Sequence, residues 1–361
     1  MTSDRDPYKA LATRLDSLPN GFPPAKDASE LRLLAKIFTP EEAELASQLL
    51  IKLETAADIA ARLQLDYTPT RSLLKGMASK GLIRAGKAEG GLGYGVLPFV
   101  VGIYENQVGD LMDAELARLF EDYYQRAFAE GMAIQPAVHR VIPVGENIRM
   151  DMQVAPFESV AGIIENAHSW ALLDCICRKQ TTLIGKGCKH TIRSCMAMSA
   201  SPDAFHTTDE LDTLTKEEAY AALRRAEQEG LVHTVSNNQQ GTWYICNCCT
   251  CSCAILRGMA KLGVANVVAS SAFVNSVDES LCTACGLCVE SCQFGALTVD
   301  EYAVVNRTSC VGCGVCINAC ADQALILVRR PENEIKPVPV NLMDWSLQRA
   351  QARGIDLTTL L

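Results

Sequence analysis

The residues most able to do chemistry in this sequence are its cysteines, of which there are 17. Residues 1–174 contain none of them, whereas residues 246–320 contain 13. An odd number of cysteines argues against a disulfide framework. Thiols packed this densely in a reducing compartment are usually metal ligands. We therefore predict metal or iron–sulfur sites in the second half of the chain.

The clearest group is an internal repeat in residues 278–328, whose second copy follows the first by 28 residues. Each copy has the spacing C-x₂-C-x₂-C-x₃-C. In this spacing three thiolates surround one cubane cluster, and the fourth reaches the cluster of the other copy. We predict two [4Fe–4S] clusters here, with two zinc sites as the alternative. The expected ligands are Cys282, Cys285, Cys288 and Cys320 for the first cluster, and Cys310, Cys313, Cys316 and Cys292 for the second.

This repeat resembles the bacterial two-cluster ferredoxin over its whole length. Gly286, Gly312 and Gly314 would let the backbone bend closely around inorganic sulfide. The ferredoxin family has proline after the fourth cysteine of each copy, where this sequence has Gln293 and Ala321. The absence of these prolines does not affect which residues bind the clusters, but it can change the solvent exposure and the reduction potential of the clusters.

A second group of cysteines lies in residues 175–195, and its members are Cys175, Cys177, Cys188 and Cys195. Five basic residues and no acidic ones lie between Arg178 and Arg193, ends included. Such cations favour the reduced, more negative state of a cluster. We predict a third [4Fe–4S] cluster, with a zinc site or scattered structural thiols as alternatives. His190 is expected to be a neighbour of the site rather than a ligand.

A third group places five cysteines in residues 246–253. Alternate residues of a strand face opposite sides, which would put Cys249, Cys251 and Cys253 on one face. The favoured interpretation is a fourth cluster on these three and Cys248, with Cys246 as the spare thiol. The alternatives are ligands shared between the two groups, a zinc site, or a redox-active thiol pair.

Hydrophobic periodicity and helix caps predict an α+β protein in five parts. These are an N-terminal arm (1–27), a winged helix-turn-helix (28–104), a central mixed α/β cysteine-rich region (105–275), a two-cluster ferredoxin-like domain (276–330) and a C-terminal tail (331–361). Helices are predicted over 8–15, 29–38, 40–51, 55–63, 68–80, 111–130, 157–173 and 217–229, and from 344 onward. Residues 82–84 and 94–96 flank a glycine-rich tip and are predicted to form the wing.

The predicted winged helix carries little positive charge. Residues 55–97 have a net charge of +3, whereas a DNA-reading domain usually shows a stronger basic stripe. We expect a structural or partner-docking role, although DNA binding stays open. The net charge of −9 over the whole chain argues against a broad nucleic-acid or anionic-membrane surface.

The remaining composition is that of a globular protein. Apolar residues make up 48% of the chain and charged residues 21%. No uncharged apolar stretch is long enough to cross a membrane. The first residues lack a basic segment followed by an apolar one. We therefore expect a cytoplasmic protein without membrane insertion.

Four features are similar to a family of multi-cluster ferredoxin-like proteins of anaerobic bacteria and archaea. They are the segment 95–105, the C-x-C-R sequence at 175–178, the G-L-V-H turn at 230–233 before the I-C-N-C-C segment, and the closing repeat. The resemblance covers most of residues 28–330. Where that family has three consecutive cysteines, this sequence has Cys251-Ser252-Cys253. The resemblance implies an electron-transfer component that works beside redox enzymes.

The combined prediction is an electron-transfer protein with several [4Fe–4S] clusters, relaying low-potential electrons to or within a partner oxidoreductase. No catalytic residue is predicted, so a subunit of an oxidoreductase complex is favoured over a stand-alone enzyme. The rival is a redox-sensing winged-helix transcription regulator. A third hypothesis is a catalytic subunit with its own substrate at the five-cysteine segment.

Overall fold

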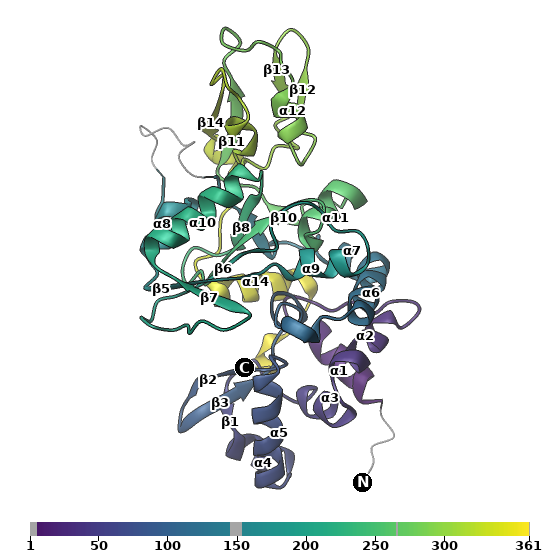
Figure 1. Cartoon of the computed structure of the whole chain (residues 1–361). Helices are drawn as coiled ribbons and strands as arrows, with labels where there is room; N and C mark the ends of the chain where they lie inside the picture. Colours follow the sequence, from purple (N-terminus) through teal and green to yellow (C-terminus); the bar gives the residue numbers. More distant parts are fainter. Residues whose placement is uncertain (1–5, 145–153, 265, 361) are drawn as a thin grey trace. The chain divides into compact units, whose positions relative to one another are not determined.

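The computed structural model describes residues 6–144, 154–264 and 266–360, which fall into two compact units. One unit takes its residues from Met1–Gly131 and Ser346–Leu361, and the other from Met132–Trp345. Both combine helices with sheets (Figure 1), as the predicted α+β class requires.

The first unit begins with helices that the sequence places well. Threonine caps start two of them, because Thr39 and Thr55 each form a reciprocal capping box with the acidic residue three positions later. The helices are α1 (Pro7–Asp16), α2 (Ser29–Ile37), α3 (Pro40–Ala46), α4 (Ala56–Leu63) and α5 (Tyr67–Ser79). A hairpin follows near the predicted positions, and the three strands have the order β1-β3-β2. Their bounds are Glu54–Thr55 for β1, Arg84–Ala88 for β2 and Gly91–Gly95 for β3.

Aromatic side chains form the rest of this unit's core. The rings of Tyr104 and Phe120 stack with centroids 3.9 Å apart, and Tyr123 and Tyr124 are fully buried. One helical stretch carries three of these residues and largely coincides with the helix predicted over 111–130. It comprises α6 (Ala114–Tyr123), the π-helix η3 (Tyr124–Phe128) and α7 (Ala129–Gly131). The segment η1 (Phe99–Ile103), whose central backbone is not helical, and the short turn η2 (Gly109–Leu111) precede it.

The C-terminal residues complete the first unit. Helix α14 (Leu342–Arg353) begins close to the predicted position. Arg353 forms an ion pair of 2.7 Å with Asp16, and Nε of Arg349 donates to the carbonyl of Pro19 at 2.9 Å. The chain from 346 onward, which ends in the turn η6 (Leu357–Thr359), therefore packs on the N-terminal helices.

A seven-stranded sheet dominates the second unit. Its order is β10-β4-β8-β9-β6-β5-β7, with β10 and β4 parallel and the other pairs antiparallel. The strands are β4 (His139–Val141), β5 (Ser169–Asp174), β6 (Arg193–Ser199), β7 (Leu211–Leu214), β8 (Val232–Ser236), β9 (Tyr244–Cys248) and β10 (Val268–Ala269).

The two faces of this sheet have different coverings. Helices α8 (Val160–Glu165) and α10 (Lys216–Gln228) pack in one apolar core with Met196, Met198 and Ile245. Because side chains alternate along a strand, the residues between these face the opposite side. Helices α9 (Ile176–Leu183) and α11 (Ala254–Leu262) each have a cysteine as their N-cap residue, Cys175 and Cys253 respectively.

One predicted element is wrong. The helix predicted over 157–173 is instead the turn η4 (Pro156–Glu158), α8 and strand β5. Short apolar runs fit a helix or a strand equally by periodicity. Here Trp170–Leu173 pairs with both β6 and β7, and this tertiary pairing decides the structure.

The repeat forms a small lobe of the second unit with two two-stranded sheets. Its strands are β11 (Phe273–Val277), paired with β14 (Leu325–Arg329), and β12 (Leu297–Val299), paired with β13 (Ala303–Val305). Short helices α12 (Leu287–Ser291) and α13 (Val315–Asn318) follow the first cysteines of each copy, and the turn η5 (Glu332–Glu334) follows β14. Within the described ranges no helix is both long and apolar enough to cross a membrane.

Candidate metal centres

The two copies of the repeat have matching backbone conformations. Three positions in each copy have positive φ, and each lies 28 residues from its counterpart. The pairs are Ala284 (57°) with Gly312 (69°), Gly286 (81°) with Gly314 (79°), and Gly295 (60°) with Gln323 (52°). The local turns that bend the chain around the cysteines are thus repeated, as the sequence suggests.

Each copy frames a cavity lined by four cysteines. One cavity, of about 20 Å³, is lined by Cys282, Cys285, Cys288 and Cys320. The other, also of about 20 Å³, is lined by Cys292, Cys310, Cys313 and Cys316. In both cases the fourth thiol comes from the other copy, which is the crossing expected of a two-cluster repeat.

Donors converge on these thiols. The amides of Ala296 and Ala324 lie 3.3 Å from the Sγ atoms of Cys292 and Cys320, one in each copy. The side-chain amide of Asn275 donates to Sγ of Cys316 at 3.1 Å. Burial raises the pKa of Cys313 to about 12, so a metal must displace its proton. Four thiols around a cavity, with N–H groups directed at sulfur, fit a [4Fe–4S] group.

A second centre lies on the thiol-bearing side of the seven-stranded sheet, where six cysteines form a closed ring. Each thiol hydrogen-bonds two others, in the order Cys175, Cys177, Cys253, Cys248, Cys246, Cys195 and back to Cys175. Hydrogen bonds from Cys177 and Cys195 hold the pKa of Cys175 well below its usual range. The same bonds, together with burial, raise the pKa of Cys177 and of Cys195.

Strand register explains why these six meet. Strands β6 and β9 pair Met196 with Ile245, so the next antiparallel pair is Cys195 with Cys246. Cys248 lies two residues beyond Cys246 and shares its face. Cys175 and Cys253 stand at the N-caps of α9 and α11, and those helix ends complete the ring.

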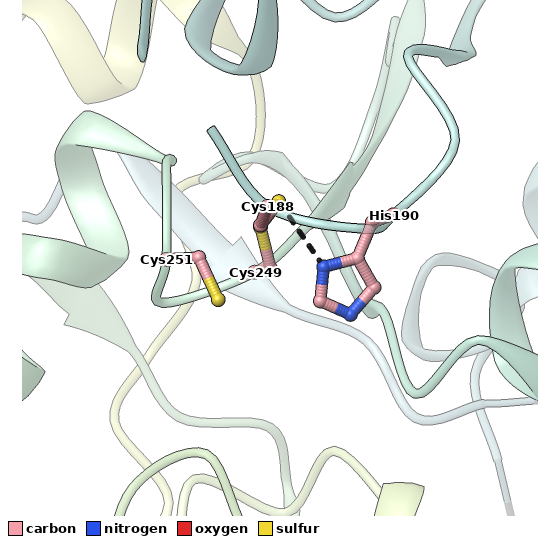
Figure 2. Close-up of side chains that lie close together, drawn as sticks. All are labelled: Cys188, His190, Cys249 and Cys251. Atoms are coloured by element: carbon pink, nitrogen blue, oxygen red, sulfur yellow. Dashed lines mark hydrogen bonds between the residues drawn. The ribbon is translucent and has the colours of Figure 1, made fainter. Parts of the chain in front are cut away.

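The remaining central thiols form a third centre with a histidine (Figure 2). The donor atoms of Cys188, His190, Cys249 and Cys251 all lie within 4.8 Å of one another. Sγ of Cys188 is 3.8 Å from Sγ of Cys249 and 3.3 Å from Nδ1 of His190. A hydrogen bond with Cys249 raises the pKa of His190 to about 9. Burial opposes ionisation of Cys249, yet His190 and Arg178 lower its pKa to about 6.

The structure thus divides the nine central cysteines differently from the two sets predicted by spacing. Cys188 was expected with Cys175, Cys177 and Cys195, but it lies with Cys249 and Cys251. Cys248 and Cys253, expected beside those two, belong to the ring, as does the supposedly spare Cys246. The physical reason is that β9 ends at Cys248, so strand alternation does not continue through Cys253.

Arg178 connects the ring with the third centre. It is 1% exposed, and its Nη1 lies 3.0 Å from the carbonyl of Asn247 and 3.8 Å from Sγ of Cys249. Burial lowers its pKa, but the charges of Cys175, Cys195 and Cys249 raise it above the usual value, so the guanidinium stays charged. The sequence places Arg178 next to Cys177, but nothing in the pattern shows that it spans two centres.

Gln293 links the central thiols to the repeat. Its Oε1 accepts from the amide of Thr250 at 2.7 Å, and its Nε2 donates to the carbonyl of Gly230. These contacts lie at a cleft of about 1230 Å³ that is also lined by His190 and Cys251. Gln293, one of the two residues at which this chain departs from the ferredoxin pattern, therefore forms an internal contact that spacing alone does not reveal.

Comparison with known proteins bears on the repeat. Residues 276–298 match the family model described as "4Fe-4S binding domain", which covers the first copy. No curated protein and no solved structure matches the chain. Together with the thiol groups, the match identifies an iron–sulfur protein with a 4Fe–4S binding domain in its C-terminal part.

Proposed function

We propose that this protein transfers single electrons by means of three [4Fe–4S] clusters, passing them to or within a partner oxidoreductase. The observation that carries the proposal is the pair of cavities in the repeat, each lined by four thiols with one exchanged between copies. One-electron transfer is the chemistry that such clusters supply when bound. The chain's own contribution is to hold, bury and electrostatically adjust them.

The six-cysteine ring is the proposed site of the third cluster. Its thiols are brought together from β6, β9, α9 and the N-caps of α9 and α11. Helix N-termini favour negative charge, and the buried Arg178 adds a full positive charge. Both favour thiolates and a cluster that becomes more negative on reduction. A cubane uses one thiolate per iron, so four of the six thiols suffice.

The contacts of Gln293 support an electron path between the repeat and the ring. Gln293 directly follows Cys292, a proposed ligand in the repeat. Its partner Thr250 lies two residues from Cys248, a member of the ring. This brings the two cluster-bearing parts of the second unit into hydrogen-bond contact.

The surface around Cys285 suits a redox partner. Cys285 is exposed, and the flanking Leu281 and Leu287 are 49% and 47% exposed. Two acidic residues lie near this surface. Glu279 is close to Cys285 in sequence, and Asp322 is brought near by accepting a hydrogen bond from Thr283 at 2.7 Å. We propose that a partner with an apolar centre and a basic rim docks here.

The repeat assignment is tested by the double variant C310S/C313S, prepared without oxygen. It should lose at least four irons per chain and the EPR signal of one cluster, given four irons per cubane. Ser291→Ala, a change at a half-buried residue beside Cys292, is the control and should keep the full iron content. A double variant with wild-type iron and sulfide would refute the assignment.

The ring assignment is tested by changing its six cysteines to alanine one at a time. Because a cubane needs four thiolates, four variants should lose iron and two should retain it. Retention of iron in all six variants would show that the ring does not bind a cluster. Loss in all six would contradict a cubane and indicate a larger cluster.

A further inference from the structure

We propose that Cys188, His190, Cys249 and Cys251 bind a single tetrahedral Zn²⁺ ion, and not a fourth iron–sulfur cluster. This inference is independent of the proposed electron transfer, since zinc has no redox chemistry in proteins. It concerns the thiols that neither the repeat nor the ring uses.

The spacing of the donor atoms carries the argument. Sulfurs bound to one tetrahedral ion at about 2.3 Å lie about 3.8 Å apart. The observed separation of the Cys188 and Cys249 sulfurs is 3.8 Å, and all four donors lie within 4.8 Å of one another. In the described ranges these residues form the one group of three or more candidate donors that meets this limit. The ligands of a cubane bind separate irons and lie farther apart.

The donor types agree with this geometry. Three thiolates and one imidazole form a closed structural zinc set, and C-x-H and C-x-C pairs supply it here from two loops. Figure 2 shows the imidazole and the three thiols lying close together, with Nδ1 of His190 directed at Cys188. The hydrogen bond between His190 and Cys188 would be exchanged for two bonds to the ion, with release of protons.

The surroundings supply outer contacts of the kind that zinc sites have. Oγ of Ser252 lies 3.5 Å from Sγ of Cys188 and in turn accepts from Thr181 at 2.8 Å. Three thiolates and Zn²⁺ carry a net charge of −1, which the buried Arg178 beside Cys249 balances. Ala226 and Leu231 pack against Cys249 and shield the site on that side.

A structural role follows from what the ion would join. It would tie the loop at 188–190 to the loop at 249–251, which lies between the ring members Cys248 and Cys253. Thr250, in the middle of this loop, is the residue that contacts Gln293. Zinc would thus fix the segment that connects the ring with the repeat.

The experiment is anaerobic metal analysis of the full-length protein, combined with zinc X-ray absorption. The wild type should contain one zinc per chain with three sulfurs and one nitrogen around it. C188S/C251S should lose that zinc and keep its iron. The triple variant C195A/C246A/C248A leaves the ring only three thiols, too few for a cubane, and should lose iron and keep zinc. His206→Ala changes an exposed histidine and should keep both.

A further variant keeps the test informative if the double variant fails to fold. His190→Cys should retain one zinc, with four sulfurs in its first shell in place of three. Zinc absent from the wild type, iron bound to these four side chains, or an unchanged zinc shell in His190→Cys would each overturn the proposal. A wild-type protein without iron in the repeat would instead contradict the proposed electron transfer. The failure of the zinc proposal and the failure of the proposed function are therefore distinguishable.

Discussion

Arg178 shows most directly how a single residue adjusts the proposed centres. It is buried and charged, it interacts electrostatically with Cys175 and Cys195 of the ring, and it contacts Cys249. We expect Arg178→Met to lower the reduction potential of the ring cluster by roughly 50–100 mV, because a buried cation nearby stabilises the more negative state. The measurement is an EPR-monitored redox titration.

Lys189→Met is the matched control for Arg178. It removes the same charge from an exposed residue close in sequence. Solvent and salt screen an exposed charge, so the shift should be much smaller. A potential that rises, or that stays unchanged in Arg178→Met, would show that Arg178 has no electrostatic effect on a cluster.

At the same scale, the sequence predicts which residues could bind metal better than it predicts how they group. The sequence places all 17 cysteines in predicted metal-binding segments, and the two sets proposed for the repeat each line one cavity. In the repeat the ligands come from one short motif, in which the fourth cysteine of each copy is known to reach the cluster of the other copy. In the centre the grouping depends on strand register between β6 and β9, which single-sequence spacing does not contain.

At the scale of elements, the left-handed turns of the repeat make different demands on two glycines. Gly312 has φ +69°, and a Cβ there would lie 2.1 Å from the carbonyl oxygen of Phe273. Gly286 has φ +81° but no atom within 4 Å of its Cβ position. Gly286→Ala should therefore cost only the backbone strain, about 1 kcal/mol, whereas Gly312→Ala should cost about 3 kcal/mol or more because backbone must move.

Anaerobic denaturant unfolding of both variants checks this prediction. Iron retention measured alongside should follow the same order, with Gly312→Ala the poorer. Equal losses of free energy of unfolding in the two variants would mean that the contact with Phe273 does not constrain the turn.

The helices and hairpin of the first unit have the order of the predicted winged helix, and we expect them to serve docking rather than sequence reading. Two of the basic residues are ion-paired, Arg62 with Glu54 at 2.6 Å and Lys80 with Glu42 at 2.8 Å. Any DNA binding should be weak and should collapse between low and physiological salt. A salt-resistant gel shift on the promoter of its own operon, abolished by Arg71→Ala, would contradict this and favour a regulator.

The elements themselves were largely predictable, with one instructive exception. Capping boxes at Thr39 and Thr215 start helices close to where the sequence places them. The apolar run at 169–173 cannot be recognised as a strand from its own sequence, because the pairing with β6 and β7 that makes it one is non-local. Local sequence signals therefore predict the helices. The sheet that holds the ring depends on long-range strand pairing, which local signals do not contain.

At the scale of the second unit, Gln293 should matter more than its counterpart Ala321. Gln293→Met removes two hydrogen bonds to Thr250 and Gly230 while keeping side-chain length. We expect a loss of about 1–3 kcal/mol in the free energy of unfolding and faster hydrogen exchange at Thr250. Ala321→Met adds the same side chain at the equivalent exposed position and should change neither. Similar exchange in both variants would argue against the contact.

At the scale of the whole molecule, the 17 cysteines divide into eight in the repeat, six in the ring and three beside His190. The most direct test is the count of iron, sulfide and zinc in protein prepared without oxygen, with Mössbauer spectroscopy to identify the iron. Three cubanes and one zinc site predict about 12 irons, about 12 sulfides and one zinc per chain. About 16 irons without zinc would contradict the division into ring and zinc site, and about eight irons would remove the cluster from the ring.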